Sequence, residues 1–157
     1  MSQWSQAEKI IVGCCGIAAV LCFLPWWSVS MSMPGGTETL GSSNAFQSTW
    51  GVLAFLATIV AGGLVAADRS GMLPWGRKTA LLAPFAAAAG AVVFMLVFFG
   101  EAGRDLGPFG QMMSGSRTVW FFAALIAMGV AAFQTFKRWQ SSAAAVPPAT
   151  GDEAPGA

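Results

Sequence analysis

The chain contains no histidine and no tyrosine, and only 10% of its residues are charged. Without histidine it cannot form a histidine-ligated haem or metal site, and it cannot use imidazole as a catalytic acid or base. A typical soluble domain carries about 25% charged residues, so this composition differs strongly from that of soluble proteins. The formal net charge of +1 offers no basic surface for nucleic acid. These deficits favour a membrane protein without conventional catalytic groups.

Charged residues are absent from four long apolar runs, which are residues 10–27, 50–67, 80–100 and 118–136. An α-helix rises about 1.5 Å per residue, so each run as a helix would cover about 30 Å of hydrocarbon. The runs are continuous rather than alternating, which argues against the strands of a membrane barrel. With short links between them, they predict an all-α membrane protein built as an antiparallel four-helix transmembrane bundle.

Basic residues are distributed unevenly between the two predicted ends of this bundle. Six flank the runs on one side and two on the other, namely Lys9, Arg69, Arg77, Lys78, Lys137 and Arg138 against Arg104 and Arg117. Because basic loops remain in the cytoplasm, both termini and the middle loop are predicted to be cytoplasmic. Residues 1–140 would then form a four-span domain in a bacterial cytoplasmic membrane, and residues 141–157 a disordered cytoplasmic tail.

The seven tryptophans lie near predicted span boundaries. They form two groups, Trp4, Trp75 and Trp139 at the inner boundary and Trp26, Trp27, Trp50 and Trp120 at the outer boundary. Indole prefers the headgroup level, where its ring is half buried and its N–H stays hydrated. The tryptophans therefore favour the same topology. The small residues of Ser28-Val29-Ser30 suggest signal-peptide cleavage as an alternative, but the bulky Pro25-Trp26-Trp27 before them disfavours it.

The segment 28–49 is the longest link between two runs. From Ser28 to Met33 small polar residues alternate with apolar ones, which is the period of a strand, and Pro34-Gly35-Gly36 is a turn signal. This pattern predicts a small β-hairpin, with a flexible Ser/Gly loop as the alternative. The glycine-rich segment 101–116 is predicted to hold no long element.

Small residues recur four positions apart in the runs, as in Gly62 with Ala66 and Ala86 with Gly90. Such spacing predicts close helix packing within the bundle, with a homodimer seam as the alternative. The third run ends in bulky aromatic residues that would face lipid or a partner helix. The resulting interface candidates are Trp26, Trp27, Trp50, Trp120, Gly62, Gly63, Gly90, Phe94 and Phe98.

Candidates for chemistry are few. Cys14, Cys15 and Cys22 lack C-x-x-C spacing and are interpreted as buried small hydrophobic residues. One hydrogen bond each to a neighbouring helix would satisfy Thr58 and Gln134. A second set, Glu101, Arg104 and Asp105, is interpreted as a loop salt bridge, with a cation or acid–base site as the alternative. The sequence therefore predicts no enzyme activity, no metal and no cofactor.

Two sequence patterns carry a family resemblance. Phe23-Leu24-Pro25-Trp26-Trp27-Ser28 follows the first run, and Asn44-Ala45-Phe46-Gln47 with Trp50-Gly51 leads into the second. Both resemble a family of uncharacterised small bacterial four-span proteins that are frequent in actinobacteria. The resemblance covers about residues 10–136 and implies no established activity. The layout is also superficially similar to claudin-type tetraspans, but the cysteine pair of their first outer loop is absent here.

Together these features predict a non-catalytic integral membrane protein that acts as a structural or accessory subunit through helix packing and outer-loop contacts. Its expected partners are the lipid bilayer and other membrane proteins or copies of itself, with no nucleic acid. The alternative is an oligomeric channel or transport component for ions or small solutes. A third hypothesis, an enzyme acting on lipid or quinone, would depend on Glu101, Arg104 and Asp105.

Overall fold

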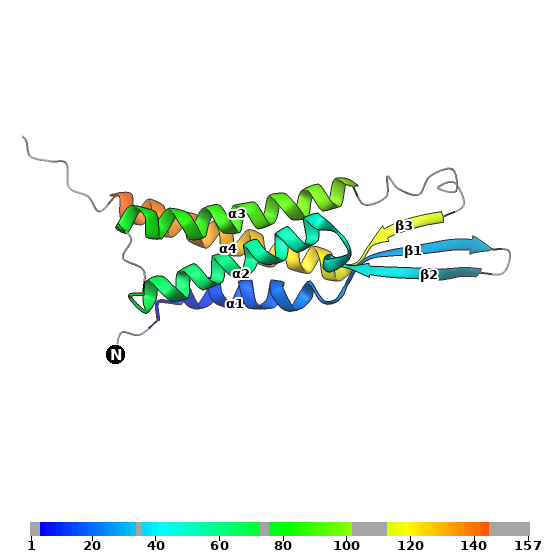
Figure 1. Ribbon diagram of the computed structural model, residues 1–157, viewed down its shortest axis with the longest axis horizontal. Helices are drawn as coiled ribbons and strands as arrows, with labels where there is room; N and C mark the ends of the chain where they lie inside the picture. The colour runs from blue at the N-terminus through cyan, green and yellow to red at the C-terminus, as the bar shows by residue number, and fades with distance from the viewer. Residues whose placement is uncertain (1–3, 34–35, 73–75, 102–112, 145–157) are drawn as a thin grey trace, which may run out of the picture.

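A computed structural model describes residues 4–33, 36–72, 76–101 and 113–144. Four helices lie side by side, and a sheet extends from one end of them (Figure 1). In chain order the elements are α1 (Gln6–Leu21), β1 (Pro25–Met33), β2 (Gly36–Asn44), the 3-10 helix η1 (Ala45–Gln47), α2 (Thr49–Arg69), α3 (Arg77–Glu101), β3 (Met113–Arg117) and α4 (Val119–Ala144).

The helices form an antiparallel bundle in which α1 and α3 each pack against both α2 and α4. Within the described residues, three helices are long and apolar enough to cross a membrane, and these are α2, α3 and α4. The chain is therefore mostly helical and has the properties of a membrane protein. The fourth helix, α1, is shorter, with 16 residues.

The first predicted span, 10–27, is helical only in part. The helix begins at Gln6, where Ser5 Oγ accepts a hydrogen bond from the Glu8 N–H and the Glu8 carboxylate accepts one from the Ser5 N–H. It ends at Leu21, and β1 begins at Pro25. The run 10–27 is therefore not helical to its end, because proline lacks the N–H of the helical ladder and disfavours helical backbone in the residue before it.

Two other helix boundaries differ from the sequence expectation. The third helix, α3, begins at Arg77, before the predicted run 80–100, and contains Pro84. The last helix, α4, continues to Ala144 and so includes the first residues of the predicted tail. The remainder of that tail, 145–157, lies outside the described residues.

The expected hairpin is present, but it belongs to a larger sheet. Its three strands are antiparallel and lie in the order β2-β1-β3. The third strand, Met113–Arg117, lies in a segment predicted to hold no long element. A five-residue strand is not a long element, but the sequence does not predict it, because it forms by pairing with the free edge of β1.

Candidate functional site

The helix–sheet junction, comprising residues 21–27, 44–51 and 115–121, is where the chain passes from the bundle to the sheet. At the end of α1 the carbonyl groups find donors outside the helix. Leu21 O accepts from the Leu24 N–H at 3.2 Å and from the Trp26 indole Nε1–H at 2.8 Å. Cys22 O accepts from the Ala45 N–H at 3.3 Å. The helix therefore ends inside the protein with these two carbonyl groups paired.

Trp26 is the central side chain of the junction and is fully buried. The pairing of β1 with β2 is irregular at this residue, and such a bulge redirects a side chain. The Trp26 ring meets Phe98 of α3 and Phe121 of α4 edge-on, with centroid distances of 5.5 and 5.4 Å. Its carbonyl accepts from the Thr118 N–H at 3.1 Å. Trp26 thus connects α1, α3, α4 and β1, rather than lying half buried as predicted.

The second sequence pattern forms the other side of the junction. The Asn44 side chain caps η1 by accepting from the Phe46 N–H at 3.1 Å. Ala45 is fully buried, and a Cβ atom on Gly51 would collide with its carbonyl oxygen. Glycine at residue 51 therefore allows η1 to fold closely onto α2. Both patterns that carry the family resemblance lie in this junction.

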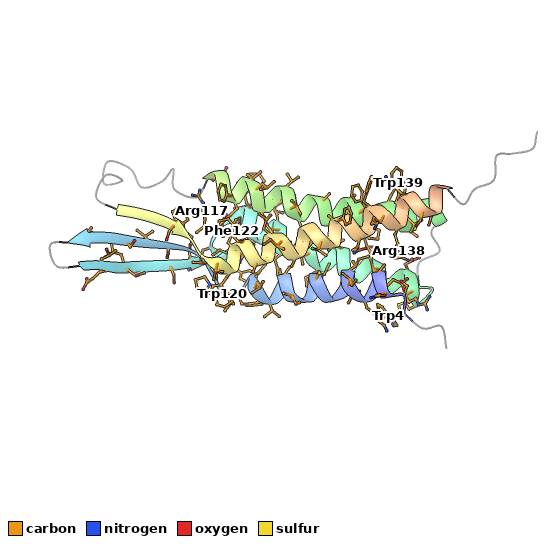
Figure 2. All side chains as sticks on the ribbon, turned by 180° about the vertical axis from the view of Figure 1, so that it is seen from behind. Trp4, Arg117, Trp120, Phe122, Arg138 and Trp139 are labelled. Carbon is orange, nitrogen blue, oxygen red and sulfur yellow. The ribbon has the colours of Figure 1, made fainter. Side chains whose placement is uncertain are left out.

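Trp27 lies at the base of the sheet beside an arginine. The Arg117 guanidinium lies 5.1 Å from the Trp27 ring centroid and 4.0 Å from that of Phe99, and it donates to Phe99 O. A Cβ atom on Gly115 would collide with the Trp27 ring. Figure 2 shows Arg117 and Trp120 where the helices meet the sheet, and Trp4 and Trp139 at the other end. The described members of the two tryptophan groups therefore lie at opposite ends, whereas Trp75 lies outside the described residues.

The register gives the sheet two chemically different faces. Ser28 of β1 lies opposite Ser42 and Ser116, and Ser30 lies opposite Thr39. Cross-strand partners share a face, and the Ser28 and Ser116 hydroxyl oxygens lie 3.0 Å apart. Thr37 lies on the same face because it is two residues from Thr39 on the same strand. We call this surface the hydroxyl face, and it comprises Ser28, Ser30, Thr37, Thr39, Ser42 and Ser116.

The opposite face carries the alternate residues of β1, Trp27, Val29 and Met31. Its neighbours on the flanking strands include Glu38, opposite Met31, and Arg117, opposite Trp27. Alternation in the sequence therefore separates hydroxyl groups from apolar groups.

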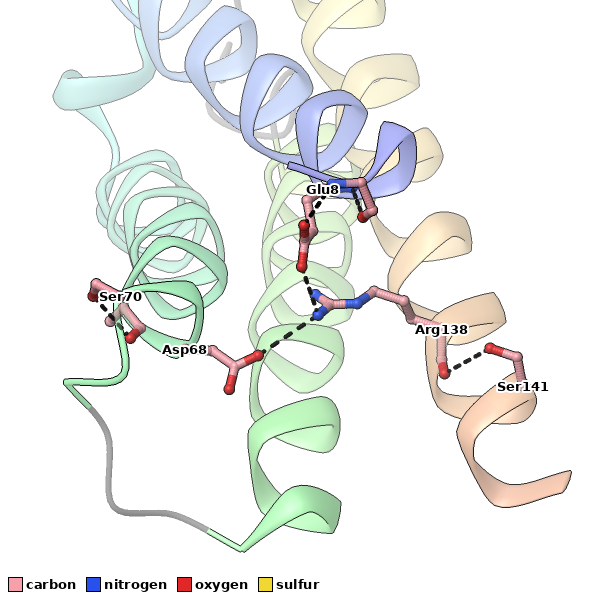
Figure 3. A network of polar contacts seen from close by, with 7 residues as sticks. Glu8, Asp68, Ser70, Arg138 and Ser141 are labelled. Carbon is pink, nitrogen blue, oxygen red and sulfur yellow. Dashed lines mark hydrogen bonds and ion pairs between the residues drawn. The ribbon is translucent and has the colours of Figure 1, made fainter. Parts of the chain in front are cut away.

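A charged clamp, defined as Glu8, Asp68 and Arg138, joins three helices (Figure 3). It lies at the end of the bundle away from the sheet, where Figure 2 labels Arg138. Arg138 Nη2 of α4 lies 3.0 Å from Glu8 Oε1 of α1 and 3.6 Å from Asp68 Oδ2 of α2. Burial raises the pKa of Glu8, but hydrogen bonds with Ser5 and the positive charges of Arg138 and Arg69 outweigh it and lower the pKa. The clamp therefore holds an ionised carboxylate between three helices.

The structure brings some interface candidates together. Phe98 packs against Trp26 in the core, and Trp50 stacks on Phe94 with ring centroids 6.1 Å apart. Trp120 is 43% exposed at the start of α4. Trp26 and Phe98 therefore have internal roles, whereas Trp120 faces outward.

The glycine candidates divide in the same way. A Cβ atom on Gly62 would lie 3.1 Å from Cys15 Cβ, so this glycine serves the packing of α2 on α1. Cβ atoms on Gly63 and Gly90 would meet nothing within 4 Å. Gly63 and Gly90 therefore lie on faces that a lipid or a neighbouring helix could cover.

The remaining polar candidates are Thr58 and the predicted loop set of Glu101, Arg104 and Asp105. Thr58 Oγ1 donates to Ala54 O of its own helix at 2.8 Å, so the predicted bond to a neighbouring helix is wrong. Of the predicted loop set, Arg104 and Asp105 lie outside the described residues. In the part of the chain that the structure describes, no group of three or more His, Cys, Asp or Glu residues could hold a metal ion.

Neither the known protein-family models nor the curated proteins contain a match to this chain. The junction, the sheet and the clamp provide aromatic contacts, hydroxyl groups and the partly exposed ion pairs of Arg138, which are groups suited to contact and positioning.

Proposed function

We propose that this protein is a non-catalytic accessory subunit of a membrane assembly that presents its three-stranded sheet to a partner. The projection of the sheet beyond the bundle carries the proposal (Figure 1). Trp26 fastens the base of the sheet to three helices, so the sheet has a fixed direction relative to the bundle. A preorganised surface loses little conformational entropy on binding, and this favours recognition.

The proposed topology has four spans in a bacterial cytoplasmic membrane, with both termini in the cytoplasm. Three long apolar helices support it, and α1 completes the bundle beside α2 and α4. The basic residues Lys9, Arg69 and Arg138 support the orientation, because they belong to the helix ends opposite to the sheet. The sheet would then lie outside the cell.

Two surfaces of the sheet suit a partner. On β2, residues 36–42 are all exposed, and among the described strands it forms an edge of the sheet. An edge strand offers unpaired backbone groups, although the irregular register near Leu40 limits how long a partner strand could pair. The hydroxyl face lies beside this edge and carries no charge. The partner would therefore be recognised through neutral hydrogen bonds.

Photo-crosslinking in native membranes tests this function. A photoreactive amino acid at Thr39, on the exposed edge strand, is expected to give a discrete protein adduct. The matched control is the same amino acid at Ile126, which is 67% exposed on α4 and is expected to give lipid adducts. Protein adducts at Ile126 alone would show that the helices, and not the sheet, provide the binding surface.

An oligomeric channel or transport component is the alternative function. The open faces at Gly63 and Gly90 favour it, because small residues allow helices of neighbouring copies to approach closely. Purified protein in liposomes would then conduct ions or small solutes. An impermeable liposome would leave the accessory function as the better explanation.

A further inference from the structure

We infer that non-helical chain completes the first membrane crossing: residues 22–27 lie within the outer leaflet, and Phe23 and Phe46 contact its lipid. This inference rests on the proposed four-span topology. It concerns an interaction surface for acyl chains at the helix–sheet junction, below the exposed part of the sheet.

The length of α1 provides the first argument. Its uncharged part, from Ile10 to Leu21, would cover about 18 Å at about 1.5 Å per residue. The hydrocarbon core is about 30 Å thick, so about 12 Å remain to be crossed. The charge-free parts of the other three helices, residues 49–67, 79–100 and 119–136, are longer and show no such deficit.

The clamp shows that α1 is not displaced along the bundle to compensate. The Arg138 guanidinium, in the last part of α4, contacts Glu8 near the start of α1. The same guanidinium also contacts Asp68 near the end of α2. The charged ends of three helices are thus at one level. The deficit of α1 must therefore lie at its other end, next to the sheet.

Contacts at the sheet end of the bundle show how far along the bundle axis Trp26 lies. Its carbonyl accepts from the N–H of Thr118, directly before α4, and its ring touches Phe121 in the first turn of α4. It also touches Phe98, close to the end of α3. Trp26 therefore lies where the apolar parts of α3 and α4 end, and the chain between Leu21 and Trp26 lies deeper.

Non-helical backbone is tolerated at membrane depth only where its polar groups are paired or buried in protein. The junction meets this requirement at the end of α1. Leu21 O and Cys22 O have the donors described above, and Pro25 has no N–H to satisfy. Pro25 O accepts from the Thr118 hydroxyl. The chain can therefore leave the helix within the hydrocarbon without exposing these groups to lipid.

The outward side of this segment is aromatic. Phe23 is 63% exposed, and its ring lies 4.9 Å from that of Phe46 and 5.9 Å from that of Phe55. Three adjoining rings on an exposed surface fit acyl chains. Above them the sheet turns polar at the pair of Trp27 with Ser43, where the indole would mark the edge of the hydrocarbon.

Spin-label accessibility tests the inference on the full chain in liposomes. In a background with Cys14, Cys15 and Cys22 replaced by alanine, single labels are placed through Phe23→Cys, Ser43→Cys and Thr39→Cys. Phe23 is exposed, so its replacement leaves the core intact. We expect the Phe23 label to be several-fold more accessible to oxygen than to a water-soluble nickel chelate, the Thr39 label to show the reverse, and the Ser43 label to be intermediate.

A Phe23 label as accessible to nickel as the Thr39 label would overturn the inference. Failure of the proposed topology has a different signature, measured in sealed vesicles with a membrane-impermeant thiol reagent. Ser5→Cys and Thr39→Cys labelled from the same side would show that α1 does not cross. Labelling from opposite sides, with a water-exposed Phe23 label, would retain the topology and reject only the buried non-helical segment.

Discussion

Charged side chains join α1, α2 and α4 at one end of the bundle, whereas Trp26, through its ring and its backbone carbonyl, joins α1, α3 and α4 at the other. At the clamp, Arg138 reaches two carboxylates through a flexible side chain that is 25% exposed. At the junction, Trp26 is fully buried and both its ring and its carbonyl are engaged. The clamp can adjust to its surroundings, and the junction cannot.

This difference follows from what each end must do. The clamp aligns helix ends that begin or stop near the same level, and an ion pair tolerates small changes of distance. The junction must change helix into strand while pairing the carbonyl groups that the change releases. Fixed geometry is therefore needed only at the sheet end. The comparison predicts that substitutions at the junction cost more stability than substitutions at the clamp.

Trp26→Ala is expected to have the largest effect. The substitution removes a fully buried ring and the indole donor to Leu21 O, so we expect a loss of about 3 to 5 kcal/mol of unfolding free energy. Denaturant unfolding in detergent, followed by near-UV circular dichroism, measures it. Trp120→Ala is the control, because that side chain is 43% exposed and should cost less than about 1 kcal/mol. Equal losses would contradict the central position of Trp26.

Gly51→Ala should lower the unfolding free energy by less than Trp26→Ala does. Gly63, in the same helix, should respond to alanine in the opposite direction. The added methyl group collides with backbone of Ala45, which has no free rotamer, and we expect a loss of about 1 to 3 kcal/mol. Gly63→Ala is the matched control, since its Cβ meets nothing within 4 Å and alanine favours helix by about 1 kcal/mol. Thermal unfolding of both variants measures the pair. A neutral Gly51→Ala would mean that η1 does not pack tightly on α2.

The sequence predicts the helices well and the junction poorly, for physical reasons. Charge-free runs locate helices because desolvation acts on each residue, and alternation from Ser28 to Met33 locates a strand for the same reason. The strand at Met113–Arg117 has no such signal, because it forms by pairing with β1 far along the chain. Burial of Trp26 depends on a bulge, which breaks the alternation that sequence reasoning uses.

The sequence does not predict the clamp. It predicts that Glu8 caps a helix with Ser5, that Asp68 ends a helix, and that Arg138 belongs to the basic cytoplasmic end. Their pairing depends on the relative rotation of α1, α2 and α4, which local sequence does not encode. Opposite charges at the same predicted end were the available signal. Because many such charges stay solvated, this signal could not have selected the pair.

The smallest predicted effect concerns the pH dependence of the clamp. The folded protein lowers the pKa of Glu8 below its ordinary value of 4.5, so the stabilisation is present above the unfolded pKa and is lost as pH falls through the folded pKa. We expect Glu8→Gln to be less stable than the original chain by about 1 kcal/mol at pH 7, in keeping with a pair whose arginine is partly exposed. The unfolding free energy of both proteins is measured between pH 7 and pH 3. Because the two proteins share all other carboxylates, most contributions of those groups cancel in the difference. The two curves should converge at low pH, where Glu8 becomes neutral and resembles glutamine. A constant difference across this range would show that ionisation of Glu8, through its hydrogen bonds with Ser5 or its ion pair with Arg138, contributes nothing to stability at this end of the bundle.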